Sequence, residues 1–142
     1  MSIAVEIITP ERLVKQVQAD SVVVPAIDGE LGILPHHTPL VAQMKSWEIR
    51  LRSGDALELF AVSGGFIEVQ NNTVRVFAET AEMAEEINLE RARQAAERAK
   101  EVLKASRHEV DLAQAEAALR RALVRLHVAE NLRRKSQFQR PV

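Results

Sequence analysis

The distribution of glycine and proline divides this sequence of 142 residues into two regions of different character. All five glycines lie within the first 65 residues, and every proline except Pro141 lies at or before Pro39. Glycine and proline are the residues that most often interrupt regular structure. We therefore expect many short elements joined by turns in the N-terminal region, and long uninterrupted elements in the C-terminal region.

The N-terminal region follows the two-residue period of β-strands. Trp47, Ile49 and Leu51 alternate with charged residues, so that apolar and charged side chains point to opposite faces of one strand. Asn71-Asn72 is typical of a tight turn between two paired strands. About eight to ten short strands follow from this pattern, and their spacing is typical of a β-sandwich or a flattened barrel.

The C-terminal region, which begins after Ala84, follows the period of α-helices. Asn88 is a suitable N-cap for a first helix. That helix has an apolar face formed by Ala92, Ala96, Ala99 and Leu103. A second helix is predicted from alternating steps of three and four residues, which form a seam of Leu112, Ala115, Leu119, Ala122, Leu126 and Ala129. The polar segment 105–110 is about as long as the connection in an antiparallel helical hairpin.

The predicted hairpin has an alanine-rich contact face. Alanine favours helix formation, but its methyl group removes far less apolar surface from water than a leucine side chain does. The connector contains neither glycine nor proline, so the two helices are able to merge into one. From this pattern alone, a movable hairpin and a static helical appendage are equally supported.

Charge is distributed unevenly although the formal net charge is only −1. Residues 1–84 carry six Lys and Arg against eleven Asp and Glu, whereas residues 85–142 carry thirteen against nine. An acidic region joined to a basic one suggests two units with different partners. Chance asymmetry, which many small proteins show, is the alternative.

Residue types that carry catalysis or metal binding are scarce. Cysteine is absent, which excludes disulfides, thiolate metal sites and cysteine nucleophiles. His36-His37 has no third ligand at a helical metal-site spacing, so a loop that contacts a partner is favoured over a metal site. No serine lies in a nucleophile-elbow motif, and no apolar run approaches the roughly 20 residues of a membrane-spanning helix. We expect a protein that is not an enzyme.

Four arginines of the helical region form two pairs on predicted helix faces. Arg91 and Arg98 are seven residues apart, and Arg121 and Arg125 are four apart. In an antiparallel hairpin these guanidinium groups could converge on one polyanion such as a phosphate chain. Spacing alone favours the alternative of a solvated charged face.

Three stretches of the sequence together resemble the epsilon subunit of bacterial F-type ATP synthases. They are GELGILPHHTPL at 29–40, SGGFIEVQNNTVRVFAETA at 63–81 and INLERARQAAERA at 87–99. The resemblance covers nearly the whole chain in the correct order. It implies an α+β fold that is mainly β, with a ten-stranded β-sandwich over residues 1–86 and a two-helix antiparallel hairpin over residues 87–142.

The resemblance also implies a role without catalysis in a proton-translocating complex. The sandwich would bind the gamma subunit and rest on the ring of c subunits, with Glu30 and His37 as candidate ring contacts. The hairpin would permit ATP hydrolysis when folded and inhibit it when extended, its basic second helix meeting the catalytic alpha/beta subunits. The chain would lie peripherally on the cytoplasmic face of the bacterial plasma membrane, without membrane insertion and without a nucleic-acid partner.

Some members of that family bind ATP through an Ile/Leu-Asp-x-x-Arg-Ala motif and arginines of the second helix. The matching positions here are Ile87, Asn88, Arg91 and Ala92, together with Arg98, Arg121 and Arg125. Asn88 replaces the aspartate, which removes a charge and weakens a hydrogen bond to an adenine amino group. We therefore expect that no cofactor is required and that MgATP binding is weakened or absent. A stand-alone ATP-sensing module and a metal-dependent enzyme using His36 and His37 are the alternatives.

Overall fold

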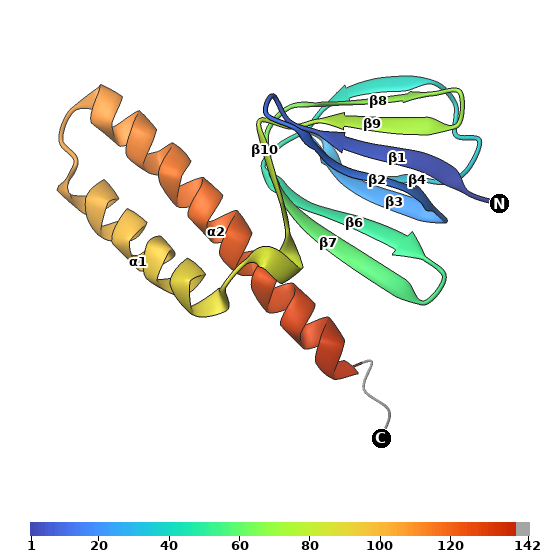
Figure 1. Cartoon of the computed structure of the whole chain (residues 1–142). Coiled ribbons are helices and arrows are strands. Elements are labelled where there is room, and N and C mark those ends of the chain that lie inside the picture. Colours follow the sequence, from blue (N-terminus) through green and yellow to red (C-terminus); the bar gives the residue numbers. More distant parts are fainter. Residues whose placement is uncertain (139–142) are drawn as a thin grey trace. The chain divides into compact units, whose positions relative to one another are not determined.

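The computed structural model describes residues 1–138, which form two compact units divided after Met83. Ten β-strands make up the first unit, and a short 3-10 helix with two α-helices makes up the second (Figure 1). This arrangement confirms the predicted α+β fold with its ten-stranded sandwich and helical hairpin. The sequence placed the boundary after residue 86. Residues 139–142, at the end of the predicted helical region, lie outside the described residues.

The strands are short, as the glycine and proline distribution predicted. Their bounds are β1 Ile3–Ile8, β2 Leu13–Ala19, β3 Ser21–Ala26, β4 Gly29–Ile33, β5 Leu40–Gln43, β6 Trp47–Ser53, β7 Ala56–Ser63, β8 Phe66–Gln70, β9 Thr73–Phe77 and β10 Thr80–Met83. They form two five-stranded sheets with the orders β2-β1-β9-β8-β5 and β10-β7-β6-β3-β4. β1 and β9 run parallel to each other, and the other paired strands run antiparallel.

The sandwich core contains alternate residues of the strands. Ile3, Val5 and Ile7 of β1 are completely buried, while the residues between them are partly exposed. Ile49 and Phe60 from the second sheet are also completely buried. Burial of each such side chain contributes roughly 1.5–3 kcal/mol. The two-residue period therefore produces two sheets that share one apolar layer.

Two turns show why particular residues are needed between the strands. Asn71 and Asn72 have φ values of 52° and 55°, as a two-residue hairpin turn requires, and they connect β8 to β9 as predicted. Gly65 has a φ of 108°, and a Cβ atom at this position would collide with the carbonyl oxygen of Phe77. Glycine therefore allows β8 to begin directly beside the end of β9.

The second unit contains η1 (Ala84–Glu86), α1 (Leu89–Ala105) and α2 (Glu109–Phe138). The Asn88 side chain caps α1, accepting a hydrogen bond of 2.9 Å from the backbone N–H of Arg91. η1 packs against α2, so it belongs with the helices. The connector between the two α-helices spans residues 106–108, which is shorter than the polar segment predicted from the sequence.

α1 and α2 pack as an antiparallel hairpin whose contact face is rich in alanine (Figure 1). Ala92, Ala96, Ala115 and Ala129 are buried, and the leucines of the predicted seam are half-buried. Val124 and Val128 are buried as well, although the predicted seam does not include them. The three-and-four spacing missed these valines because they lie on the opposite side of α2 from the seam. Within residues 1–138 no helix is long and apolar enough to cross a membrane.

Candidate partner-binding surfaces

An exposed apolar row crosses the outer face of the sheet β2-β1-β9-β8-β5. The strand register places Leu13 opposite Ile8, Ile8 beside Phe77, and Phe77 opposite Phe66. Leu13, Phe66 and Phe77 are 49%, 55% and 41% exposed. We call these four residues the apolar row. The sequence-based prediction does not include the apolar row. The signal for it was that Phe66 and Phe77 occupy strand positions whose side chains alternate toward solvent.

A charged row lies beside the apolar row on the same face. Arg75 of β9 is opposite Glu68 of β8 and beside Glu6 of β1. Its guanidinium Nε is 3.2 Å from Glu6 Oε2, and its Nη1 is 3.9 Å from Glu68 Oε1. Partly exposed ion pairs of this kind contribute little stability. An apolar strip bordered by charges is instead the usual arrangement of a protein–protein interface.

Glu30, a predicted ring-contact residue, belongs to an ion-pair network. The two terminal nitrogens of Arg50 donate hydrogen bonds of 2.9 Å to the two carboxylate oxygens of Glu30. Arg50 also donates a 3.2 Å hydrogen bond to Glu48, which is only 1% exposed. These hydrogen bonds, and above all those that Arg50 donates to Glu30, raise the pKa of Arg50 against the opposing effect of burial. The guanidinium therefore stays charged throughout the usual assay range.

The burial of Glu48 differs from the expectation for its strand. The alternation in β6 placed the charged residues on the face opposite the core, where solvent was expected. Ile49 and Leu51 are buried as expected, and Arg50 is half-buried, but Glu48 is more deeply buried than the apolar Trp47. Period-two alternation distinguishes the two faces of a strand but not the exposure of the outer one.

His37, the second predicted ring-contact residue, lies at the other end of β4 from Glu30. Glu30 is paired with Pro25 next to the turn between β3 and β4, whereas His37 follows the far end of the strand. At 3.3 Å per residue, the three steps from Glu30 to Ile33, the last residue of β4, span about 10 Å. Nδ1 of His37 is 2.7 Å from the carbonyl oxygen of Thr38. The structure therefore does not bring the two candidates into one compact contact.

The neighbouring His36 is held by its backbone. Its φ is 65°, which is uncommon for a residue other than glycine. Its N–H donates a 2.8 Å hydrogen bond to the side-chain oxygen of Asn72, which fastens this loop to the turn between β8 and β9. Within residues 1–138 there is no group of three or more His, Cys, Asp or Glu side chains that could hold a metal ion.

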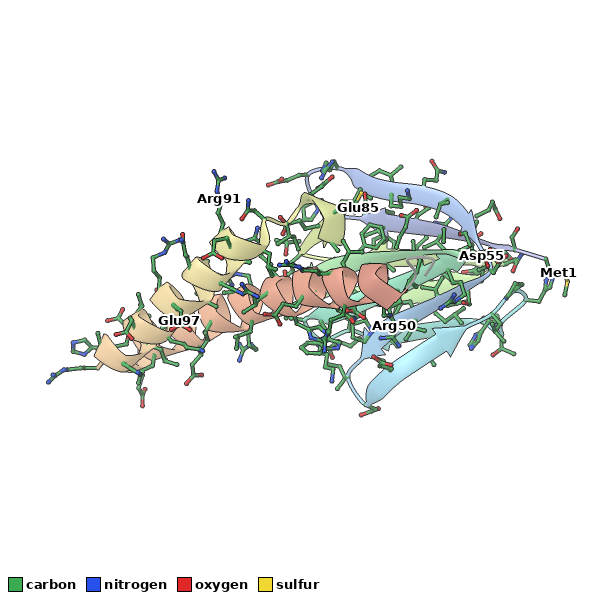
Figure 2. All side chains as sticks on the ribbon, turned by 90° about the horizontal axis from the view of Figure 1, so that it is seen from below. Met1, Arg50, Asp55, Glu85, Arg91 and Glu97 are labelled. Atoms are coloured by element: carbon green, nitrogen blue, oxygen red, sulfur yellow. The ribbon has the colours of Figure 1, made fainter. Side chains whose placement is uncertain are left out.

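In the helical unit, the seven predicted nucleotide residues occupy different environments. Ile87 and Ala92 are buried, and Asn88 uses its side-chain oxygen to cap α1. Arg91 is exposed and points outward from the first turns of α1 (Figure 2). Arg98 and Arg121 are also exposed, whereas Arg125 is half-buried.

An ion pair across the hairpin fixes the level of the predicted arginines. Arg93 Nε is 3.8 Å from Glu130 Oε1. Arg98 lies five residues after Arg93 in α1, and Arg125 lies five residues before Glu130 in the antiparallel α2. Arg98 and Arg125 therefore lie at similar positions along the hairpin axis. Arg91 and Arg121 lie on opposite sides of this position along the axis. At 1.5 Å per residue, Arg91 and Arg121 are about 16 Å apart in that direction. The four arginines are therefore spread along the hairpin.

Two open pockets lie in the helical unit. One, of about 630 Å³, is next to the connector, where its lining includes Val102, His108 and Asp111. The other, of about 470 Å³, is lined by Leu89, Arg93, Glu130, Arg133 and Arg134. Neither is lined by a predicted nucleotide residue. Arg133 and Arg134 were not predicted as site residues. Their only indication in the sequence is that they form a basic cluster with Lys135.

Comparisons with known proteins agree with this arrangement of two units. Residues 2–84 match the family described as "ATP synthase, Delta/Epsilon chain, beta-sandwich domain". Residues 85–130 match the family "ATP synthase, Delta/Epsilon chain, long alpha-helix domain". These two matches together cover most of the chain and divide it close to Met83, where the structure divides.

Relatives named "ATP synthase epsilon chain" match over nearly their whole length. That of Moorella thermoacetica is 49% identical, covering 90% of this chain and 96% of the relative. That of Desulforamulus reducens is 46% identical, covering 88% and 95%. That of Herpetosiphon aurantiacus is 44% identical, covering 96% and 100%.

Solved structures show the same fold at lower identity. A chain in the Euglena gracilis mitochondrial ATP synthase superposes with a TM-score of 0.75 at 24% identity, covering 95% of this chain and 81% of that one. A chain in the Tetrahymena thermophila mitochondrial ATP synthase gives 0.58 at 13% identity, covering 91% and 94%. The family matches and the relatives lead to one conclusion: this chain belongs to the ATP synthase delta/epsilon family, as an epsilon-type, non-catalytic subunit of the F-type ATP synthase.

Proposed function

We propose that this chain works in the central stalk of its ATP synthase, where the sandwich joins the gamma subunit to the c-subunit ring and the hairpin restrains ATP hydrolysis. The apolar row carries the first part of this proposal. Aromatic side chains, phenylalanine included, are enriched in the cores of protein interfaces. Phe66 and Phe77 form an exposed pair of this kind, and we assign this face to the gamma subunit.

The ring contact is assigned to Glu30. Glu30 and His37 lie toward opposite ends of β4, so they are two separate candidate contact points rather than one cluster. The carboxylate of Glu30 is partly exposed and held in a fixed geometry by Arg50, which suits an acceptor for polar loops of the c subunits. His37 is a second candidate contact with the ring.

The regulatory role is assigned to the helical hairpin. Its buried contact residues are mostly alanines, which hold α1 and α2 together only modestly. A connector of three residues without glycine or proline allows the helices to rearrange. When extended, the basic second helix would meet an acidic segment of the catalytic alpha/beta subunits, and salt should weaken that contact. The restraint on ATP hydrolysis follows from this extended state.

A nucleotide is proposed to have at most a minor part. The Asn88 side-chain oxygen is already used in the cap of α1, and none of the predicted nucleotide residues lines the two pockets described above. MgATP binding should therefore be weak or absent, and the subunit should need no cofactor. A stand-alone ATP sensor gains no support from this geometry. Attachment to the ring would place the chain peripherally on the cytoplasmic face of the bacterial plasma membrane, without insertion.

Co-purification with the gamma subunit tests the docking surface. The double variant Phe66→Glu/Phe77→Glu places two charges in the apolar row, and it should no longer co-purify with gamma. Val110→Glu is a matched control, because Val110 of α2 is also an exposed apolar residue, at 70%. Undiminished co-purification of the double variant would rule out this face as the gamma contact. Circular dichroism of both variants checks that the sandwich is still folded.

A further inference from the structure

Three charged side chains of the sandwich form a chain of contacts from a buried position to the surface. The side chains of Glu48, Arg50 and Glu30 are 0%, 26% and 46% exposed. Glu48 and Arg50 belong to β6, and Glu30 belongs to β4, with β3 between the two strands. Arg50 contacts both carboxylates, because its Nη1 donates to Glu48 and to Glu30 while its Nη2 donates to Glu30.

The buried end of this chain restricts the orientation of Arg50. A carboxylate without solvent is strongly unfavourable unless a cation and hydrogen bonds compensate its charge. Arg50 supplies such compensation to Glu48, at 3.2 Å. The guanidinium is planar and its donors have a fixed geometry, so a guanidinium held by Glu48 also fixes the plane of the Glu30 carboxylate.

We propose that Arg50 is a positioning residue for partner binding, which holds Glu30 as a preorganised hydrogen-bond acceptor and is itself held by Glu48. This inference rests on the proposed function, in which Glu30 contacts the c-subunit ring. The partner surface that fits is a polar loop with hydrogen-bond donors such as amide, hydroxyl or ammonium groups. A carboxylate accepts several hydrogen bonds at once, so Glu30 is able to accept from Arg50 and from a partner donor together.

Preorganisation is the physical reason for an effect on affinity. An unrestrained glutamate must lose rotamer freedom when it binds, whereas Glu30 has already lost that freedom in the free subunit. Lysine at position 50 keeps the positive charge but cannot form the two parallel hydrogen bonds. The alternative is that Arg50 only neutralises Glu48 and stabilises the sandwich. Under that alternative, replacement of both Glu48 and Arg50 by neutral residues would leave binding unchanged.

The test measures the affinity of the full chain for the purified c-subunit ring by biolayer interferometry. The variants are Glu30→Gln, Arg50→Lys, the double variant Glu48→Gln/Arg50→Gln, and the triple variant that combines all three Gln substitutions. Arg52→Gln is the matched control, because Arg52 lies two residues further along β6 and is exposed. Urea unfolding of each variant separates losses of binding from losses of stability.

We expect Glu30→Gln to weaken binding by about 10-fold or more, because it removes a charged acceptor. Arg50→Lys and the double variant should each weaken it by about 2- to 10-fold, and the triple variant should be no weaker than Glu30→Gln alone. Arg52→Gln should bind like the wild type.

Two results would overturn the inference in distinguishable ways. If Glu30→Gln weakens binding while Arg50→Lys and a folded double variant bind normally, Arg50 is only structural and the ring contact stands. If Glu30→Gln binds normally, or the wild-type chain does not bind the ring, the ring contact itself is wrong and the positioning role fails with it.

Discussion

The sandwich buries large side chains such as Phe60, Ile49 and Ile67, whereas α1 buries only the alanines Ala92 and Ala96. Buried apolar area sets the scale of stabilisation, so each core position of the sandwich contributes several times more than an alanine of the hairpin. The difference suits two different tasks. In the proposed function, a platform that joins two partners needs a rigid core, and a regulatory hairpin needs a contact that can be broken.

The largest expected effect is on the sandwich core. Phe60→Ala should lower the free energy of unfolding by about 3–5 kcal/mol, because it leaves a cavity in a site that is completely buried. Urea unfolding followed by the fluorescence of Trp47 in β6 measures this change. A decrease in the free energy of unfolding of less than about 1 kcal/mol would mean that the sandwich core is not more tightly packed than the hairpin contact.

A smaller effect is expected from overfilling the hairpin contact. Ala96→Leu should weaken the packing of α1 on α2 by about 1–3 kcal/mol, because the contact has no space for a larger side chain. Hydrogen exchange should accelerate in both helices and remain slow in the sandwich strands. Ala105→Leu at the exposed end of α1 serves as the control and should change neither. Equal acceleration in the strands would show that the two units unfold together.

The smallest effects are expected at the cap of α1. Asn88→Ala removes the hydrogen bond to the N–H of Arg91 and should destabilise the hairpin by about 0.5–2 kcal/mol. Asn88→Asp keeps the cap and adds a negative charge, which interacts favourably with the positive N-terminal end of the helix dipole. Helicity on heating, followed by circular dichroism, should therefore rank Asn88→Asp at or above the wild type and Asn88→Ala below it.

Calorimetric titration with MgATP sharpens the same comparison. The wild-type chain should show weak or no binding, and Asn88→Asp should restore it if the missing charge is the cause. Micromolar or tighter binding by the wild type would contradict the proposed minor role of the nucleotide.

The alternation of residues predicted the sandwich well, because period two and turn chemistry are local properties. Ile49 and Leu51 are in the core, and Asn71-Asn72 forms the predicted turn. The predicted turn at Asn71-Asn72 already implies that Phe66 lies opposite Phe77, because a two-residue turn fixes the register of its strands. The rest of the apolar row could not be predicted, since Ile8 and Leu13 join it only through the pairing of β1 with β9 and β2. Nor could the pattern predict that Arg50 would reach Glu30, which is twenty residues away in the sequence.

The helical residues show a different limit of sequence reasoning. Spacing predicted the alanine contact and the Asn88 cap, both of which depend on positions within one helix. Whether Arg98 lies next to Arg125 along the hairpin axis depends on how the two helices are aligned. The Arg93–Glu130 ion pair indicates this alignment. The convergence of four arginines was therefore a hypothesis that spacing within each helix was unable to decide.

ATP hydrolysis by the reconstituted complex tests the central claim, a rigid docking unit joined to a separable regulatory hairpin. Deletion of residues 88–142 removes the hairpin and leaves every strand of the sandwich. We expect the shortened subunit to co-purify with gamma and the ring, and hydrolysis to rise on the order of 5-fold, the low end of typical regulatory coupling. Unchanged hydrolysis in a fully assembled complex would contradict the regulatory role, and loss of assembly would contradict the assignment of docking to the sandwich.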